Sequence, residues 1–345
     1  MAARGADVSA GRVSLSVVTV AWSSAASLQR CAESLAGARP LARDGADRFE
    51  LVVVDNGCPD LDETRLRSVW PDLVLIRNAA NLGFGPAANQ GVAASRGEFV
   101  LLLNPDTRAQ DSPFDTLVAA FSATPGAVAV APRLVDAEAT NIAATEESQE
   151  VFQLRHLPTL GQAMRELLLI DKAWPRNRWF RRDRYLDRSR DGRFDVEQPA
   201  ASALAVRRDV FLELGGFDPR FAPAWFEDVD LCKRLLTRGR IVFLPDCVLL
   251  HEGGEAARRL GYDSFLPIYY RNARRYWRKH RGRAGAALYR GLLTAGMMLR
   301  LAVLPFRRRL PRPRAQAARA YLHVLAGALG FERATPLQAP GPSAT

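Results

Sequence analysis

Cysteine and histidine are both scarce in this sequence, with four of each among 345 residues. The cysteines stand far apart, at positions 31, 58, 232 and 247, and form no Cys-x-x-Cys pair. This spacing argues against a zinc site or a disulfide framework and fits a reducing compartment. Residues 1–12 have no apolar core, so we expect no signal peptide there, and their Ala, Gly and Ser content predicts a disordered start.

Acidic residues are few relative to basic ones, 37 Asp and Glu against 48 Lys and Arg, which gives a formal net charge of +11. Such an excess implies attraction to phosphates in nucleotides, nucleic acid or anionic lipid. Long apolar runs are lacking as well. The stretch 286–306 is mostly apolar, but Arg290 and Arg300 interrupt it, so its runs fall short of the roughly 20 residues that a membrane-spanning helix needs.

The apolar run Phe99–Leu103 is the most informative stretch that the sequence does contain. It has no helical periodicity and ends at Asn104 and Pro105, which is typical of a strand buried on both faces. Asp106 then lies just past the carboxyl end of a central strand, where open α/β sheets bind ligands. A carboxylate there suits Mg²⁺ or Mn²⁺ held against a diphosphate. The simpler interpretation is a strand followed by an Asn-Pro-Asp turn.

Strand and helix patterns alternate at short spacing from residue 15 to residue 131. This alternation predicts an α/β fold with a mostly parallel sheet and helices on both faces. Residues 21–22, Asp55 and Asp106 would then lie along one edge. Regularity is lost from 136 to 198, where charged and aromatic residues indicate either a loop over a cleft or a solvated helical hairpin. Later patterns predict strands at 203–206, 241–244 and 248–250.

Several short motifs follow one another along the chain in a fixed order. They are Val-Val-Thr-Val at 17–20, Val-Val-Val-Asp-Asn-Gly at 52–57, Asn-Leu-Gly-Phe-Gly-Pro-Ala-Ala-Asn-Gln-Gly at 81–91, Leu-Asn-Pro-Asp at 103–106, Gly-Gly-Phe-Asp at 215–218, Glu-Asp-Val-Asp-Leu at 227–231, and His251. As an ordered set they resemble the family 2 glycosyltransferases of the GT-A fold, over about residues 13–255. The Asn-Pro-Asp and Gly-Gly-Phe-Asp versions look most like the rhamnosyltransferase-type branch.

The resemblance assigns the nucleotide of a sugar donor to the first strand ends and to the Gly-rich loop. The residues that it implies are Val20, Trp22, Asp55, Asn81, Gly83 and Asn89. Asp55 would accept a hydrogen bond from the imide N–H of uracil or thymine, and the loop glycines would let the backbone approach the nucleotide or sugar closely. Asp-Asn-Gly is also a turn signal, which is the structural alternative for Asp55.

The resemblance also implies a divalent cation, Mg²⁺ or Mn²⁺, held by Asp106 and His251. Many relatives have Asp-x-Asp where this chain has Asn104 and Asp106, so one fewer negative charge should weaken cation affinity. His251 would contribute a neutral imidazole. Considered alone, a single histidine after a strand is usually structural.

Glu227 and Asp228 open a predicted helix. Inverting transfer needs one carboxylate to take the proton of the acceptor hydroxyl, and Asp228 is our choice, with Glu227 sharing that role or binding the acceptor. The structural alternative is that both acids only cap the helix. Trp225 and Phe226, just upstream, would form a sugar-stacking wall for the acceptor or simply pack.

Beyond residue 255 the composition shifts to Arg-rich and apolar helical patterns. These predict an extension at 256–334 that lies in the headgroup region of an anionic membrane, and a helical pair packed on the core is the alternative. The predicted plan is a disordered 1–12, a GT-A domain at 13–255 that includes the irregular insertion at 136–198, the extension, and a disordered tail at 335–345.

The predicted function is an inverting glycosyltransferase that moves a sugar from a dTDP- or UDP-sugar to a glycan or polyprenyl-linked acceptor, with L-rhamnose suggested by the branch. We expect it in the cytoplasm, on the inner face of the cell membrane, without a nucleic-acid partner. A nucleotidyltransferase is one alternative, although residues 21–24 lack the Lys or Arg of a triphosphate-binding loop. A non-catalytic nucleotide- or nucleic-acid-binding protein is the other.

Overall fold

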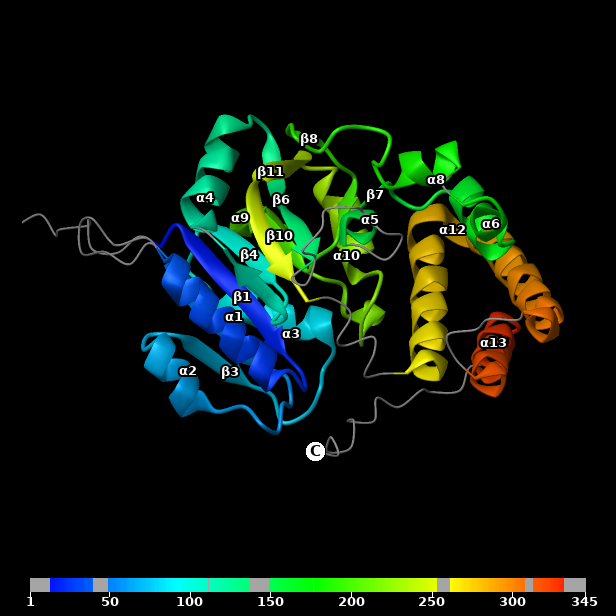
Figure 1. Cartoon of the computed structure of the whole chain (residues 1–345), viewed down its shortest axis with the longest axis horizontal. Coiled ribbons are helices and arrows are strands. Elements are labelled where there is room, and N and C mark those ends of the chain that lie inside the picture. The colour runs from blue at the N-terminus through cyan, green and yellow to red at the C-terminus, as the bar shows by residue number, and fades with distance from the viewer. Residues whose placement is uncertain are drawn as a thin grey trace, which may run out of the picture.

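The computed structural model describes residues 13–39, 49–110, 112–136, 149–175, 177–252, 261–307 and 313–331. These residues form a nine-stranded mixed sheet between layers of helices, with a further group of helices beside one end of the sheet (Figure 1). The predicted α/β fold with a helical C-terminal extension is confirmed. The segments predicted to be disordered, 1–12 and 335–345, lie outside the described residues.

The strands are β1 (Leu15–Ala21), β2 (Phe49–Asp55), β3 (Val74–Arg77), β4 (Phe99–Leu103), β5 (Thr107–Ala109), β6 (Ala127–Asp136), β7 (Leu154–Arg155), β8 (Phe194–Asp195), β9 (Gln198–Pro199), β10 (Ala203–Arg207) and β11 (Arg240–His251). The α-helices are α1 (Ala25–Ala38), α2 (Glu63–Val69), α3 (Phe84–Ala94), α4 (Pro113–Ala123), α5 (Gln149–Gln153), α6 (Leu160–Leu167), α7 (Ile170–Ala173), α8 (Arg178–Asp183), α9 (Arg208–Glu213), α10 (Glu227–Leu235), α12 (Tyr262–Val303) and α13 (Arg314–Ala328). Two short 3₁₀ helices are η1 (Pro219–Phe221) and η2 (Leu304–Phe306).

The strands of the large sheet lie in the order β3-β2-β1-β4-β10-β6-β11-β5, with β8 paired to β11. The first four are parallel, β10 runs antiparallel between β4 and β6, and β11 is parallel to β6. Strands β1, β2 and β4 are buried along their whole length, which explains why their sequences are mostly apolar and why β4 is apolar throughout. The carboxyl ends of the parallel strands share one edge of the sheet.

The long strand β11 corrects one prediction. The sequence predicts two strands, at 241–244 and 248–250, because Pro245 cannot donate to a strand ladder. The structure instead has one strand of 12 residues, whose pairing with β6 shifts in register between Leu244 and Val248. This irregularity accommodates the proline, and the strand continues until His251 reaches the edge of the sheet.

Helices cover both faces of the sheet. Helices α1, α2 and α4 pack with one face, and α3, α9 and α10 pack with the other. Helix α3 approaches β1 so closely that a Cβ at Gly91 would lie 2.4 Å from Val18 Cγ1, so only glycine fits there. All four cysteines are free and buried.

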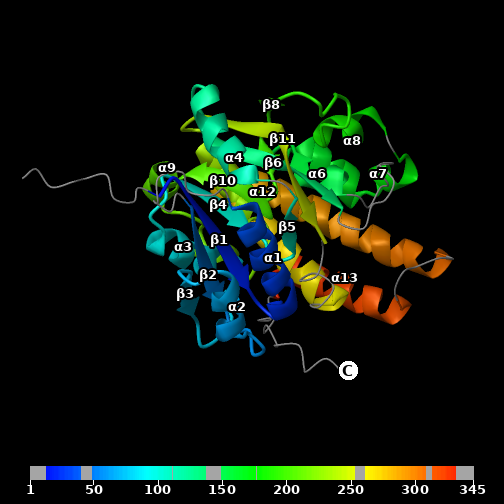
Figure 2. The same ribbon diagram turned by 60° about the vertical axis from the view of Figure 1, so that its left-hand side comes forward.

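Helix α12 is 42 residues long and changes direction at Gly282, whose φ of 66° and ψ of −167° are not helical. Its second arm, after Gly282, runs beside α13 (Figure 2). Both helices and α6 share an apolar cluster with Phe221 and Phe226 of the sheet domain. The C-terminal extension therefore packs on the core, which is the alternative that the sequence left open. The described part of the insertion at 136–198 contains the short helices α5 to α8.

Candidate active site

Asp55 is the last residue of β2 and lies at the carboxyl edge of the sheet, opposite Ala21 at the end of β1. It is buried, and its Oδ1 accepts a hydrogen bond of 2.8 Å from the backbone N–H of Cys58. The turn after β2 thus orients the carboxylate of Asp55 at the strand end. The resemblance assigns binding of the nucleobase to this position. Of the other residues predicted on this edge, Trp22 is half-buried and Val20 belongs to the core.

Asparagine side chains hold the loop before α3. Asn56 Nδ2 donates to Asn81 Oδ1 over 2.8 Å, and the same oxygen accepts the backbone N–H of Gly83 over 2.8 Å. Gly83 has a φ of 92°, and a Cβ there would lie 2.8 Å from the backbone of Pro223. Pro223 precedes α10. The loop that contains Asn81 and Gly83 therefore lies between the carboxyl edge of the sheet and the start of α10.

Asn89 lies further along α3 and fixes the Gly-Gly-Phe-Asp turn. Its Nδ2 donates to the carbonyl of Phe217, and its Oδ1 accepts the N–H of the same residue, each over 2.8 Å. The amide therefore uses both of its polar groups within the protein. Asn89 has a structural role in this arrangement, and its contact with the nucleotide stays a prediction.

Asp106 and His251, the two predicted metal ligands, lie together at the end of β11. Asp106 Oδ1 is 3.1 Å from His251 Nε2, and both side chains are buried. A carboxylate and an imidazole are ligands that divalent cations accept, and Thr107 Oγ1 next to them is buried without a hydrogen-bond partner in the described part of the chain. The residues therefore fit a divalent cation. The described residues hold no group of three His, Cys, Asp or Glu suited to a metal.

The turn before α10 has an unusual backbone. Trp225 and Phe226 both have positive φ, 71° and 72°, which is rare for bulky residues. Asn272 of α12 holds this turn, because its Nδ2 donates to the carbonyls of Ala224 and Trp225 over 2.9 and 3.0 Å. Backbone strain of this kind is concentrated at functional sites, and both aromatic residues line the cavity described next.

A cavity of about 590 Å³ lies at the start of α10. Asp228, Trp225, Phe226 and His251 all line it, so the structure brings predicted catalytic, acceptor-binding and metal-binding residues to one place. Gln198 Nε2 donates to Asp228 Oδ2 over 3.3 Å, which orients the carboxylate. Burial raises the pKa of Asp228, which makes it a stronger base than an exposed aspartate.

Glu227 lies beside Asp228 in a different environment. It is buried, and its Oε2 has no hydrogen-bond partner among the residues that the structure describes. Burial, and then the charge of Asp228, raise the pKa of Glu227 well above its usual range. Gln198 orients the carboxylate of Asp228, whereas Oε2 of Glu227 has no such partner among the described residues, so Asp228 is the better placed proton acceptor of the two.

Asp230, the last acid of the same motif, has a role that the sequence analysis missed. It is fully buried and lies 2.6 Å from Lys279 Nζ and 2.8 Å from His280 Nε2, both on α12, and 2.8 Å from Arg234 Nη2. Burial raises its pKa, but hydrogen bonds from His280 and Lys279 outweigh burial, so the pKa of Asp230 is lowered. Asp230 thus ties α10 to α12. The sequence did contain one indication that Asp230 matters, since this residue belongs to the Glu-Asp-Val-Asp-Leu motif.

The strand order, the helices on both faces and the acids at the carboxyl edge define the molecule as a GT-A glycosyltransferase. Its fold resembles a mannosyltransferase from Pyrobaculum calidifontis, solved with GDP-Man and Mn²⁺, with a TM-score of 0.52 and 16% identity over 95% of this chain and 90% of that one. The family model "Glycosyl transferase family 2" matches residues 16–187.

Two relatives from Mycobacterium tuberculosis are similar in sequence. The N-acetylglucosaminyl-diphospho-decaprenol L-rhamnosyltransferase is 30% identical over 262 residues, which cover 71% of this chain and 78% of that protein. The pre-mycofactocin glycosyltransferase is 26% identical over 242 residues, which cover 69% of this chain and 42% of that protein. The chain belongs to glycosyl transferase family 2. This membership confirms the predicted family, fold and enzyme class, and excludes the nucleotidyltransferase alternative.

Proposed function

We propose that this glycosyltransferase moves a sugar, with inversion, from a nucleoside diphosphate donor to a hydroxyl of a lipid-linked glycan. The first candidate donor is dTDP-L-rhamnose, and UDP-sugars are the next. The similar rhamnosyltransferase supports this assignment, since its name specifies both the sugar that is transferred and a lipid-linked diphosphate acceptor. The product would be a growing cell-surface glycan.

The observation that carries the proposal is the placement of Asp228. Its carboxylate is oriented by Gln198 in a cavity that His251 and Trp225 also line. In the proposed reaction Asp228 accepts the proton of the acceptor hydroxyl while that oxygen forms a bond to the anomeric carbon. The bond from this carbon to the diphosphate breaks, and the nucleoside diphosphate leaves with the electron pair.

The other predicted site residues divide into two groups. Val20, Trp22, Asp55, Asn81, Gly83 and Asn89 belong to the proposed donor side, where Asp55 would receive the imide N–H of uracil or thymine. Asp106 and His251 would hold Mg²⁺ or Mn²⁺, and a cation bound there would stabilise the charge of the diphosphate. Trp225, Phe226 and Glu227 form the proposed acceptor side.

Nucleotide release tests this function. Purified protein is incubated with dTDP-, UDP- and GDP-sugars and a short-chain prenyl diphosphate-linked N-acetylglucosamine, with Mn²⁺ or with a chelator. We expect acceptor-dependent release of dTDP from dTDP-L-rhamnose that the chelator reduces. Asp106→Ala should reduce release as the chelator does, whereas Asp195→Ala, on an exposed strand, should not. Release that does not depend on the acceptor, with every donor, would contradict the proposal.

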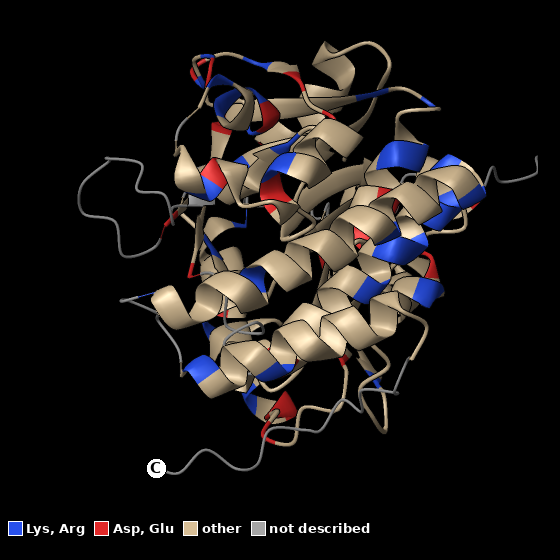
Figure 3. Ribbon diagram, turned by 90° about the vertical axis from the view of Figure 1, so that its right-hand side faces the viewer, with Lys and Arg blue, Asp and Glu red and all other residues tan. Residues whose placement is uncertain are grey.

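We also propose that the protein associates peripherally with an anionic membrane on its inner face. Lys and Arg are frequent on the side where α12 and α13 lie (Figure 3). Six arginines line a cavity of about 510 Å³ on α12: Arg271, Arg274, Arg275, Arg278, Arg283 and Arg290. Large apolar side chains exposed on or beside these helices are Leu288, Met298, Phe306, Leu322, Leu329 and Phe331. Basic and apolar surface together suit a headgroup region.

The stretch Tyr262–Phe306 also contains a segment that is long and apolar enough to cross a membrane, with 28% of it buried, so composition alone does not separate the two modes. Cosedimentation with phosphatidylglycerol vesicles tests the proposal. Replacing Arg278 and Arg290 by Ala should weaken binding by roughly tenfold or more, at about 1 kcal/mol for each arginine. Equal binding to phosphatidylcholine vesicles would contradict peripheral, charge-driven association.

A further inference from the structure

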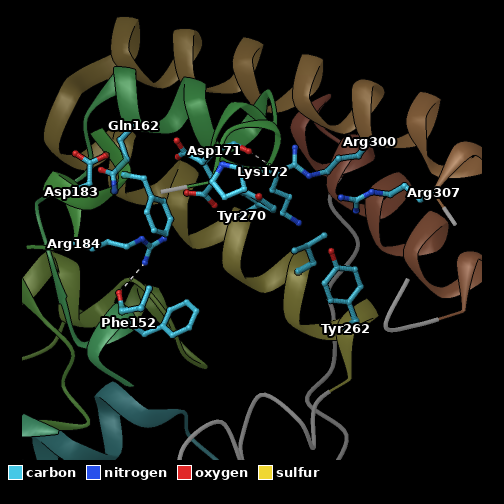
Figure 4. A pocket seen from close by; sticks show the side chains of 15 residues that line it. Phe152, Gln162, Asp171, Lys172, Asp183, Arg184, Tyr262, Tyr270, Arg300 and Arg307 are labelled. Atoms are coloured by element: carbon cyan, nitrogen blue, oxygen red, sulfur yellow. Dashed lines mark hydrogen bonds between the residues drawn. The ribbon is translucent and has the colours of Figure 1, made fainter. Parts of the chain in front are cut away.

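A second cavity, of about 600 Å³, adjoins the cavity of Asp228 (Figure 4). The two share five lining residues: Phe152, Gln162, Glu166, Arg184 and Tyr270. Helices α6, α7 and α8 of the insertion contribute to this second cavity, and so do the start of α12 and the residues around its end. A molecule could therefore occupy both cavities at once, with one end at Asp228 and the other between the insertion and α12.

Four cationic side chains line the second cavity: Lys172, Arg184, Arg300 and Arg307. Burial, and then the charges of Arg307 and Arg300, lower the pKa of Lys172, and the charge of Glu166 opposes this only in part. Arg184 is fixed over the rings of Phe180 and Phe152, at 4.5 and 5.6 Å. Burial, and then Arg155, lower the pKa of Arg184 to about 10.

Three acidic residues line the cavity, and one of them, Glu166, offsets part of the positive charge on Lys172 and Arg184. The other two are engaged elsewhere. Asp171 and Asp183 both pair with Arg165, whose Nε lies 3.4 Å from Asp171 Oδ1. Within the described ranges, Lys172 and Arg307 have no carboxylate within salt-bridge distance. Positive charge that is partly buried and unpaired is stabilised by a bound anion.

Exposed aromatic side chains lie close in the sequence to two of the cations that line the cavity. Trp174, two residues after Lys172, is 60% exposed, and Phe306, next to Arg307, is 84% exposed. Arg300 is part of the cavity wall, and its Nη2 donates to the carbonyl of Glu166 over 2.9 Å. A ligand that suits a cationic cavity with exposed aromatic residues nearby in the sequence has a strongly charged head and an apolar tail.

We propose that the second cavity binds the diphosphate of a prenyl diphosphate-linked acceptor. Lys172, Arg184 and Arg307 contact the phosphates, the prenyl chain leaves past Trp174 and Phe306, and the sugar enters the cavity of Asp228. This assignment rests on the proposed function and adds the location and the side chains that select a diphosphate. Arg300 is a positioning residue, because its guanidinium is held by backbone carbonyls.

Geranylgeranyl diphosphate, a short prenyl diphosphate without a sugar, is the probe. Binding is measured by calorimetry, with geranylgeraniol and inorganic pyrophosphate as the two half-molecules. We expect the diphosphate to bind at least tenfold more tightly than either half. The double variant Lys172→Ala, Arg307→Ala should lose at least tenfold in affinity. The matched control is Arg238→Ala, which removes an exposed arginine that pairs with Glu213 on the surface and lines neither cavity.

Two further measurements keep the result interpretable. A charge-retaining variant, Lys172→Arg with Arg307→Lys, should bind within about threefold of wild type, and all variants should have equal melting temperatures. Donor binding is measured separately with dTDP. Failure of the proposed function would appear as no sugar transfer by the wild-type protein, regardless of whether geranylgeranyl diphosphate binds. Absence of probe binding, or equal loss in the Arg238→Ala control, would overturn the inference.

Discussion

The two sides of the site are built in different ways. On the proposed donor side, Asp55 ends one strand that is buried on both faces and Asp106 follows another, so the register of the sheet fixes their positions. On the proposed acceptor side, Trp225 and Phe226 lie on a strained turn that Asn272 holds from another part of the chain. The sheet alone therefore positions the donor groups, whereas the position of the acceptor groups depends on α12.

The largest effect is expected at Asp228. Asp228→Asn removes the proton acceptor while keeping the shape of the side chain, so kcat should fall roughly 10²- to 10⁴-fold. Binding of dTDP should stay within about twofold of wild type, because the donor side is formed by the strand ends. Initial rates and calorimetry measure the two quantities. Loss of nucleotide binding together with turnover would break the distinction between the two sides.

The next largest effect concerns the link from α10 to α12. Asp230→Asn leaves Lys279, His280 and Arg234 without their buried carboxylate, which should lower the free energy of unfolding by about 3–5 kcal/mol. Urea denaturation measures it. Asp195→Asn is the matched control, because Asp195 pairs with Arg240 on the surface and should cost less than about 1 kcal/mol. Equal losses would show that the buried link does not stabilise the acceptor side.

The pH dependence of transfer should also separate the two sides. Burial raises the pKa of Asp228 from 3.8, and the base must be ionised to accept a proton. Below this raised pKa, kcat/KM should therefore fall about tenfold per pH unit, with the acid limb at higher pH than an exposed aspartate would give. Because Glu227 titrates with Asp228, the limb belongs to the pair. An acid limb at or below pH 3.8, with the fold intact by circular dichroism, would contradict it.

The smallest effect is expected at Asn89. Asn89→Ala removes two hydrogen bonds to the backbone of Phe217, at about 1 kcal/mol each in free energy of unfolding. Because its amide is already used within the protein, the donor KM should change less than about threefold. Thermal denaturation and donor titration measure both. A tenfold rise in donor KM without loss of stability would instead support the nucleotide contact that the sequence predicts.

The regular part of the fold was predictable because parallel strands buried on both faces leave an unmistakable apolar run. Phe99–Leu103 and the acid beyond it are the best example. The meeting of Asp106 and His251 followed from family motifs rather than from local pattern, since β11 passes through a proline that suggests two strands. The acceptor side was harder, because periodicity indicates that α12 is a helix but not which side chains it presents to the turn. The sequence around Asn272 and Lys279 does not indicate which residues these side chains contact.

The direction change at Gly282 makes the C-terminal helices inseparable from the rest of the enzyme. The first arm of α12 contacts the turn at Trp225, and the second arm and α13 complete the apolar cluster around that first arm. A truncated protein that ends within α12 would therefore lose part of the apolar cluster that supports the turn at Trp225, as well as the C-terminal helix. A chimera designed to exchange acceptor preference between two family members would therefore need to exchange the insertion, the turn and both helices together.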